Sequence, residues 1–199
     1  DLSKLPSSSA GAPSINFDQY PVCPQKRLQE SNGIKVPKIM SMEEFKQDCP
    51  PEPPELITGF LHKGCKAVLG GQSKAGKSHL AKQLVDAVSK GQDFLGMPTI
   101  RSEVLYLNLE LPSFALKKRF EALNSKAPKH ADNALLNIAN GRGDWSGIES
   151  LYAMVGDIKE KGIDLIVIDP LYKVEDIDES DQARVKEVLR IFDDITNET

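Results

Sequence analysis

The sequence predicts an α/β fold, with a mainly parallel sheet covered by helices on both faces and an irregular arm at the N-terminus. Three observations lead to this prediction. A glycine-rich loop at residues 71–78 lies between a short apolar run and a segment with helical periodicity. Strand-like and helix-like segments then alternate along the rest of the chain. A strongly apolar run at 164–169 has the composition of a buried parallel strand. Alternating strands and helices form parallel sheets through right-handed crossovers.

The N-terminal region, residues 1–54, differs in composition from the rest. Its first part is rich in Ser, Pro and Gly and has little periodicity. Residues 40–46 predict a short helix, with Ser41 as N-cap and Glu44 completing a capping box. The Pro-rich run at 50–54 predicts a stiff linker. We therefore expect two parts, an arm and linker over 1–54 and an α/β domain over 55–199. The arm is either disordered on its own or packed on a neighbouring subunit, and the sequence does not separate these two interpretations.

The elements of the α/β domain follow in order from their apolar patterns. Residues 65–69 are expected to form a short buried strand before the glycine-rich loop, and the helical pattern at 79–88 follows the loop. Further strands are expected at 103–110, 134–139 and 164–169, and further helices at 113–123, 148–161 and 180–197. The inner face of the 113–123 helix is expected to consist of Phe114, Leu116, Phe120 and Leu123, and Gly162 is expected to end the 148–161 helix.

The glycine-rich loop fits the pattern G-x-x-x-x-G-K-[ST] at every fixed position. Glycines let the backbone wrap around an anion, and the start of the following helix adds about half a positive charge. Lys77 is expected to reach the β- and γ-phosphates of a nucleotide, and the Ser78 hydroxyl to be a ligand of Mg²⁺. The candidate nucleotide-binding residues are the loop and the residue after it: Gly71, Gln72, Ser73, Lys74, Ala75, Gly76, Lys77, Ser78 and His79.

Two carboxylates stand at the ends of predicted strands. Asp169 ends the 164–169 strand, and Glu110 ends the 103–110 strand. Ligands of open α/β sheets collect at the carboxyl ends of the strands. Asp169 is therefore expected beside the Mg²⁺, because a hard cation at the phosphates needs an oxygen anion from a neighbouring strand. Glu110 is expected to act in catalysis by polarising a water for attack on the γ-phosphate.

Composition narrows the class of protein. No apolar stretch approaches the roughly 18 residues of a membrane span, and no secretory signal pattern is present at the N-terminus. The three cysteines are far apart and match neither a disulfide framework nor a zinc site, which favours the cytoplasm. The net charge of −4 argues against a protein that binds nucleic acid over most of its surface. A local basic patch is still compatible with this net charge.

Several segments together resemble a RecA-like P-loop ATPase domain, and most closely the RepA-helicase-like AAA ATPases of plasmids, phages and other mobile elements. They are residues 55–61, 70–78, the strand that ends in Glu110, residues 166–174 and the acidic stretch 178–181. The resemblance covers about residues 53–199 and implies that Lys77 and Ser78 hold phosphate and Mg²⁺, that Asp169 supports the metal and that Glu110 activates water. It also implies ATP bound between the subunits of a homo-oligomer, usually a hexameric ring that acts on DNA.

The sequence departs from this family at its end. In the family, the helix that matches 180–197 leads into a further central strand, whereas this sequence stops at Thr199. In the family this strand lies between the strand before the glycine-rich loop and the strand that ends in Asp169. Since strands lie about 4.8 Å apart, its absence would leave a gap in the sheet, which must be closed by another segment, a partner chain or direct pairing of the flanking strands. We therefore expect a fragment of a longer protein that binds nucleotide and hydrolyses it slowly, with the arginine finger beyond Thr199.

Three functions compete on this evidence. The first is a DNA-associated ATPase, such as a replicative helicase or its regulator, with single-stranded DNA as a partner. The second is a nucleotide-gated regulatory or assembly module with little turnover. The third is a small-molecule kinase, which the lack of clustered lid arginines disfavours.

Overall fold

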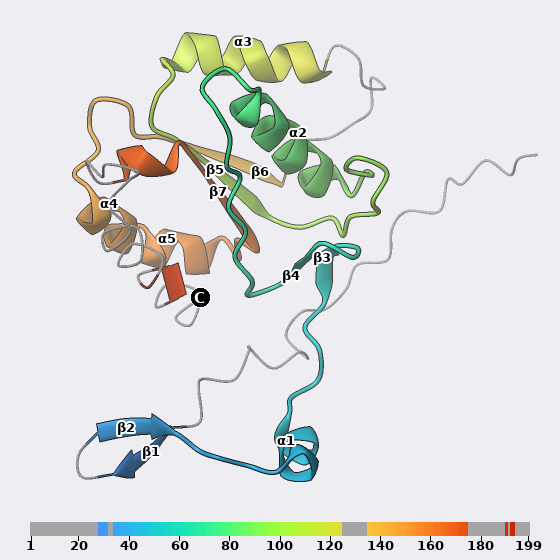
Figure 1. Ribbon diagram of the computed structural model, residues 1–199. Helices are drawn as coiled ribbons and strands as arrows, with labels where there is room; N and C mark the ends of the chain where they lie inside the picture. The colour runs from blue at the N-terminus through green and yellow to red at the C-terminus, as the bar shows by residue number, and fades with distance from the viewer. Residues whose placement is uncertain (1–27, 32–33, 125–134, 175–189, 191, 194–199) are drawn as a thin grey trace, which may run out of the picture.

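The computed structural model describes residues 28–31, 34–124, 135–174, 190 and 192–193 (Figure 1). At its centre is a sheet of three parallel strands, β5 (Val104–Asn108), β6 (Leu136–Asn140) and β7 (Leu165–Asp169). The strand order is β6-β5-β7, and in register Asn108 faces both Asn140 and Asp169. The carboxyl ends of all three strands therefore meet at one edge of the sheet.

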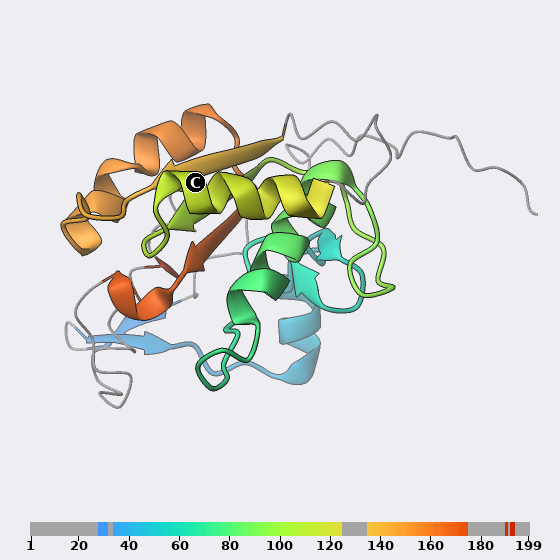
Figure 2. The ribbon, with the colours of Figure 1, turned by 90° about the horizontal axis from the view of Figure 1, so that it is seen from above.

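Helices cover both faces of this sheet. α2 (Lys77–Lys90) and α3 (Ser113–Asn124) lie over one face, as the view from above shows (Figure 2). Their core contains Val85, Val88, Leu116 and the strand residue Tyr106. α4 (Ile148–Ala153) and α5 (Val155–Glu160) belong to a second core on the other face, with Leu151 and Val155 packed around Leu107. The predicted α/β fold is confirmed.

Small elements precede and follow the strands of the central sheet along the chain. β3 (Glu55–Ile57) and β4 (Leu61–His62) form a small antiparallel pair, and the 3-10 helix η2 (Leu171–Lys173) follows β7 directly. α2 ends at Gly91, whose φ is +65°. A Cβ at this position would lie 2.9 Å from the Cβ of Arg101, so both the backbone angle and the close approach require glycine.

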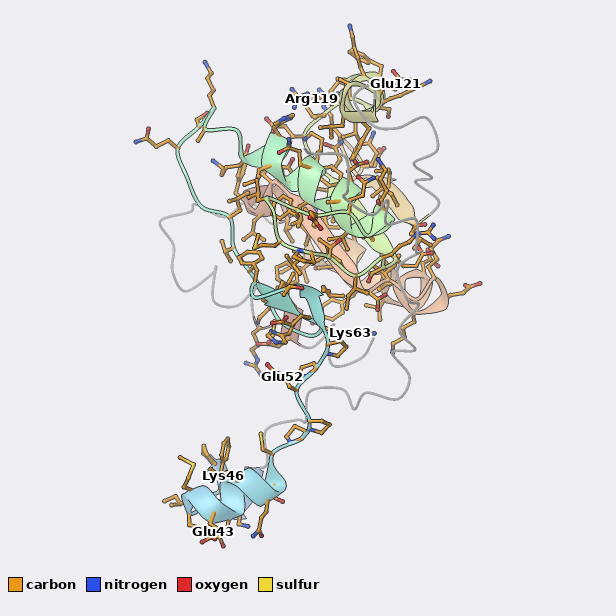
Figure 3. All side chains as sticks on the ribbon, turned by 90° about the vertical axis from the view of Figure 1, so that its right-hand side faces the viewer. Glu43, Lys46, Glu52, Lys63, Arg119 and Glu121 are labelled. Carbon is orange, nitrogen blue, oxygen red and sulfur yellow. The ribbon has the colours of Figure 1, made fainter. Side chains whose placement is uncertain are left out.

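The N-terminal region contains more regular structure than its composition indicates. β1 (Leu28–Ser31) and β2 (Ile34–Pro37) pair as an antiparallel hairpin that was not predicted, although Asn-Gly at 32–33 is the usual sequence of a two-residue hairpin turn. α1 (Met42–Asp48) begins at Ser41 with the predicted capping box. None of its residues is buried, and Figure 3 shows Glu43 and Lys46 on α1 at one end of the molecule and Arg119 and Glu121 on α3 at the other.

The strand predicted at residues 65–69 is not formed. The segment has no regular structure, and Val68 and Leu69 are 67% and 50% exposed. Strand formation needs a neighbour that supplies hydrogen bonds, and within the described residues β7 pairs with β5 alone. Residues 65–69 therefore do not pair directly with β7, which was one of the three expected ways to close the gap in the sheet.

Other predicted elements differ in detail. The helix expected at 148–161 is divided at Met154 into α4 and α5, where the Met154 N–H bonds the Leu151 carbonyl in a tighter turn and Gly156 lowers helix propensity. Phe114, expected on the inner face of α3, is 76% exposed. Most of the helix expected at 180–197 lies outside the described residues. Within the described part of the chain, no helix combines the length and the apolar character needed to cross a membrane.

Candidate functional site

The glycine-rich loop lies at the edge of the sheet where the strands end. Its residues 71–76 are exposed, and it leads into the N-terminus of α2 (Figure 1). Lys74 and Gly76 have φ angles of +63° and +91°, which turn the chain so that the helix can begin at Lys77. At Gly76 a Cβ would have space, and it is the backbone angle that makes glycine necessary. Gly71, Gln72, Ser73 and Ala75 complete the exposed loop, and His79 is an exposed residue of the first turn of α2.

Lys77 folds back over the loop. Its Nζ donates hydrogen bonds to the carbonyl oxygens of Gly71 and Gln72, at 2.5 Å and 3.0 Å. The ammonium group is thus held above the loop by two neutral oxygens. Phosphate oxygens are stronger acceptors for an ammonium group, so an arriving triphosphate can replace these carbonyls at little cost.

Ser78 and Asp169 meet across the gap between α2 and β7. The Ser78 Oγ donates a hydrogen bond of 2.9 Å to Asp169 Oδ1. The two residues are far apart in sequence and come together because α2 crosses the sheet above the end of β7. A hydroxyl and a carboxylate, side by side at a helix N-terminus, form the oxygen donor set that Mg²⁺ prefers. The described residues therefore fit a Mg²⁺–nucleotide complex, with Ser78 and Asp169 on the metal side and the loop on the phosphate side.

The second oxygen of Asp169 faces the interior of the domain. The Tyr106 hydroxyl donates a hydrogen bond to Asp169 Oδ2, and Lys82 Nζ donates one of 3.0 Å to the same hydroxyl. Lys82 Nζ also lies 3.6 Å from Asp169 Oδ2. The side chain of Lys82 is 1% exposed, and Tyr106 is fully buried. Burial lowers the pKa of Lys82, which the charge of Asp169 opposes. Burial and the bond to Asp169 raise the pKa of Tyr106 far above its ordinary value, so the hydroxyl stays protonated as a donor.

Glu110 lies at the same edge, one residue beyond a hydrogen bond between the Leu109 N–H and the Asp169 carbonyl. Its side chain is exposed and lines a cavity of about 240 Å³ with Leu109, Gly141, Arg142, Gly143, Trp145 and Lys173. These residues come from the ends of β5, β6 and β7, so the cavity opens where the three strands terminate. A carboxylate and two cationic side chains therefore share one hollow at the carboxyl ends of the strands.

Asn108 and Asn140 hold the turn that carries Glu110. Asn108, 1% exposed, donates hydrogen bonds of 2.7 Å to Leu111 O and to Asn140 Oδ1, and it accepts one from the Leu111 N–H. Asn140 in turn donates to the Ser113 hydroxyl at the start of α3. Both ends of the turn are thus fixed to the sheet, which limits the positions that Glu110 can reach.

Of the predicted site residues, the structure brings the side chains of Ser78 and Asp169 into contact, while Lys77 bonds its own loop and Glu110 lines a separate cavity. Lys77 and Ser78 lie at the start of α2, and Asp169 and Glu110 lie at the ends of adjacent strands. Sequence reasoning missed four polar residues behind them, namely Lys82, Tyr106, Asn108 and Asn140. Lys82 stands four residues after Ser78, so both are on one face of the helix, and this spacing was the available signal.

A protein-family model described as an AAA domain matches residues 34–199. No curated protein matches the chain.

Proposed function

Since the matched region spans most of the sequence, the chain belongs to the AAA domain family of P-loop ATPases, and we propose that it binds ATP with Mg²⁺ at residues 71–79 and hydrolyses it in association with DNA. In this proposal residues 55–199 form the ATPase domain and residues 1–54 an arm. The domain works as part of a homo-oligomer, with the ring assembly that the family resemblance implies.

The observation that carries the proposal is the hydrogen bond of 2.9 Å between Ser78 Oγ and Asp169 Oδ1. A serine that only begins a helix needs no carboxylate from another strand. A carboxylate at this position costs free energy unless a cation or donors offset its charge. Ser78 and Asp169 together supply oxygen ligands for a metal ion beside the loop, which a simple glycine turn lacks.

The residues around the loop then have separate tasks. Main-chain amides at 71–78 and the N-terminus of α2 bind the phosphates, and Lys77 exchanges its bonds to Gly71 O and Gln72 O for phosphate oxygens. Mg²⁺, when bound, neutralises charge that develops on the transferred phosphoryl group. Asp169 and Ser78 are the side chains that hold it.

Glu110 is the residue we assign to water activation. Its carboxylate is exposed in the cavity at the strand ends, so it can accept a proton from a water there. The turn fixed by Asn108 holds this carboxylate exposed at the ends of the strands. Attack by the water oxygen on the γ-phosphorus would break the bond between this phosphorus and the bridging oxygen, so that ADP leaves and the water's proton passes to Glu110.

The association with DNA is supported by the cations of the same cavity. Arg142 and Lys173 are exposed and line it together with Glu110. Cationic side chains bind the phosphates of a single strand, and a partly buried Trp145 offers an aromatic surface beside them. A strand bound here would lie against the residue that activates water, which links DNA binding to hydrolysis.

Single-stranded DNA is expected to raise the rate of ATP hydrolysis by at least about tenfold, measured as phosphate release with and without an oligonucleotide. The double change Arg142→Ala and Lys173→Ala should remove most of this stimulation and leave ATP affinity unchanged, because neither residue belongs to the loop. Lys117→Ala, on the exposed face of α3, serves as the control for loss of surface charge.

Other results would point to the competing functions. Binding of ATP without turnover under either condition would favour a nucleotide-gated regulatory module. Transfer of phosphate to a metabolite would favour a kinase.

A further inference from the structure

The network behind Asp169 holds a buried lysine that the proposed chemistry does not use. Lys82 is 1% exposed, and its ammonium group lies 3.0 Å from the Tyr106 hydroxyl and 3.6 Å from Asp169 Oδ2. Removing a charge from water costs several kcal/mol unless partners offset the loss. A protein that needed only a filled core at this position would be served better by leucine or methionine. The free-energy cost of burying this charge indicates that Lys82 and the Tyr106 hydroxyl have a function at the site.

The geometry indicates what that task is. Ser78 and Lys82 are four residues apart on α2, so the helix presents both to Asp169 from one face. Ser78 binds Oδ1, while the Tyr106 hydroxyl binds Oδ2. A carboxylate that is held at one oxygen can still rotate about its last bond. One that is held at both oxygens, by Ser78 of α2 and by Tyr106 of β5, loses this freedom.

Tyr106 is itself fixed on several sides. It belongs to β5, whose main chain is bonded to β6 and β7, and its ring meets Phe120 of α3 edge to face, with centroids 5.6 Å apart. Lys82 donates to its oxygen, which leaves the hydroxyl proton directed at Asp169. The hydroxyl therefore points in one direction only.

We propose that Tyr106, oriented by Lys82, is a positioning residue that fixes the Asp169 carboxylate so that Oδ1 faces Ser78 and the metal. This inference rests on the proposed function, because it concerns the affinity of the same site for Mg²⁺. Mg²⁺ demands near-ideal octahedral geometry, so a donor that is held in place in advance matters more for it than for a flexible Ca²⁺ site. Groups that orient metal ligands in this way commonly change metal affinity by about 10- to 100-fold.

The test compares nucleotide affinity with and without the metal. Binding of a fluorescent ATP analogue is measured in excess Mg²⁺ and in EDTA. The dissociation constant in EDTA divided by that in Mg²⁺ gives the factor by which the metal strengthens binding. Tyr106→Phe removes one oxygen and is expected to lower this ratio by about tenfold or more, while affinity in EDTA stays the same. Tyr152→Phe, the same change at an exposed tyrosine on α4, should behave as the wild type.

A second comparison separates positioning from a general loss of stability. In the background of Asp169→Asn, Tyr106→Phe should have no further effect on the ratio, since the hydroxyl acts through that carboxylate. An unfolded fraction of the protein lowers the amplitude of both titrations and leaves the ratio of the two dissociation constants unchanged. If Tyr106→Phe does not fold, Phe120→Leu loosens the same ring and should lower the ratio less strongly.

Two negative results are distinguishable. A wild type with Mg²⁺-dependent binding and an unchanged ratio in folded Tyr106→Phe overturns the positioning role alone. A wild type that binds no nucleotide in either buffer overturns the proposed function, and the positioning role with it.

Discussion

Lys77→Ala is expected to weaken ATP binding by about 100-fold. In the structure its Nζ bonds two acceptors, Gly71 O and Gln72 O, so it can also make two bonds to phosphate oxygens. Each bond from a charged donor contributes roughly 1.5 kcal/mol or more, and about 1.4 kcal/mol corresponds to a factor of ten in affinity. Titration with a fluorescent ATP analogue in excess Mg²⁺ measures this loss directly.

The control for Lys77 is a lysine of equal charge away from the loop. Lys117 is 77% exposed on α3 and lies 3.8 Å from Glu121, a weak surface pair. Lys117→Ala should bind ATP within about twofold of the wild type, because its only role is at the surface. If Lys77→Ala kept the wild-type affinity, the phosphates would not lie at this loop, and the site would have to be placed elsewhere.

Glu110→Gln is expected to lower the rate of ATP hydrolysis by about 100-fold or more while ATP affinity stays within about twofold. Glutamine has the same shape but cannot accept the proton of an attacking water, and general bases contribute about 10²- to 10⁴-fold to rates. Glu110 lies in the cavity at the strand ends and not in the loop, so binding should persist. Because the wild-type rate is expected to be low, hydrolysis is measured under single-turnover conditions over hours.

The matched control for Glu110 is Glu121→Gln. Glu121 has a side chain 63% exposed on α3, and its loss should leave both rate and affinity unchanged. If Glu110→Gln weakened ATP binding and hydrolysis to the same extent, the carboxylate would act in binding rather than on water. If the rate did not change at all, another group would have to activate the water.

The elements that the sequence predicted well are those whose own pattern is strong. The apolar run before Asp169 forms β7, and the helical spacing after the glycine loop forms α2. The capping box at Ser41 and Glu44 was readable because both residues act within four positions of each other. Such local chemistry depends little on the rest of the chain.

The failures occur where a distant neighbour decides the outcome. Residues 65–69 have the composition of a strand but form none, since pairing depends on a partner strand and not on the segment alone. The spacing of Lys82 from Ser78 puts both on one face of the helix, but the sequence does not show that Asp169 lies beside that face. Asn108 likewise sits in a strand pattern, and its role in holding the Glu110 turn depends on Asn140 of another strand. Sequence therefore predicts local elements better than the contacts between residues that are far apart in the chain.

The central claim is that a Mg²⁺–triphosphate complex is held between residues 71–78 and Asp169. The most direct test is a crystal structure with Mn²⁺ and a non-hydrolysable ATP analogue, in which anomalous scattering locates the metal. We predict a metal peak within roughly 2.3 Å of Ser78 Oγ, on the side that faces Asp169, with the phosphates enclosed by the main chain of the loop. A nucleotide bound elsewhere, or a metal far from both Ser78 and Asp169, would contradict it.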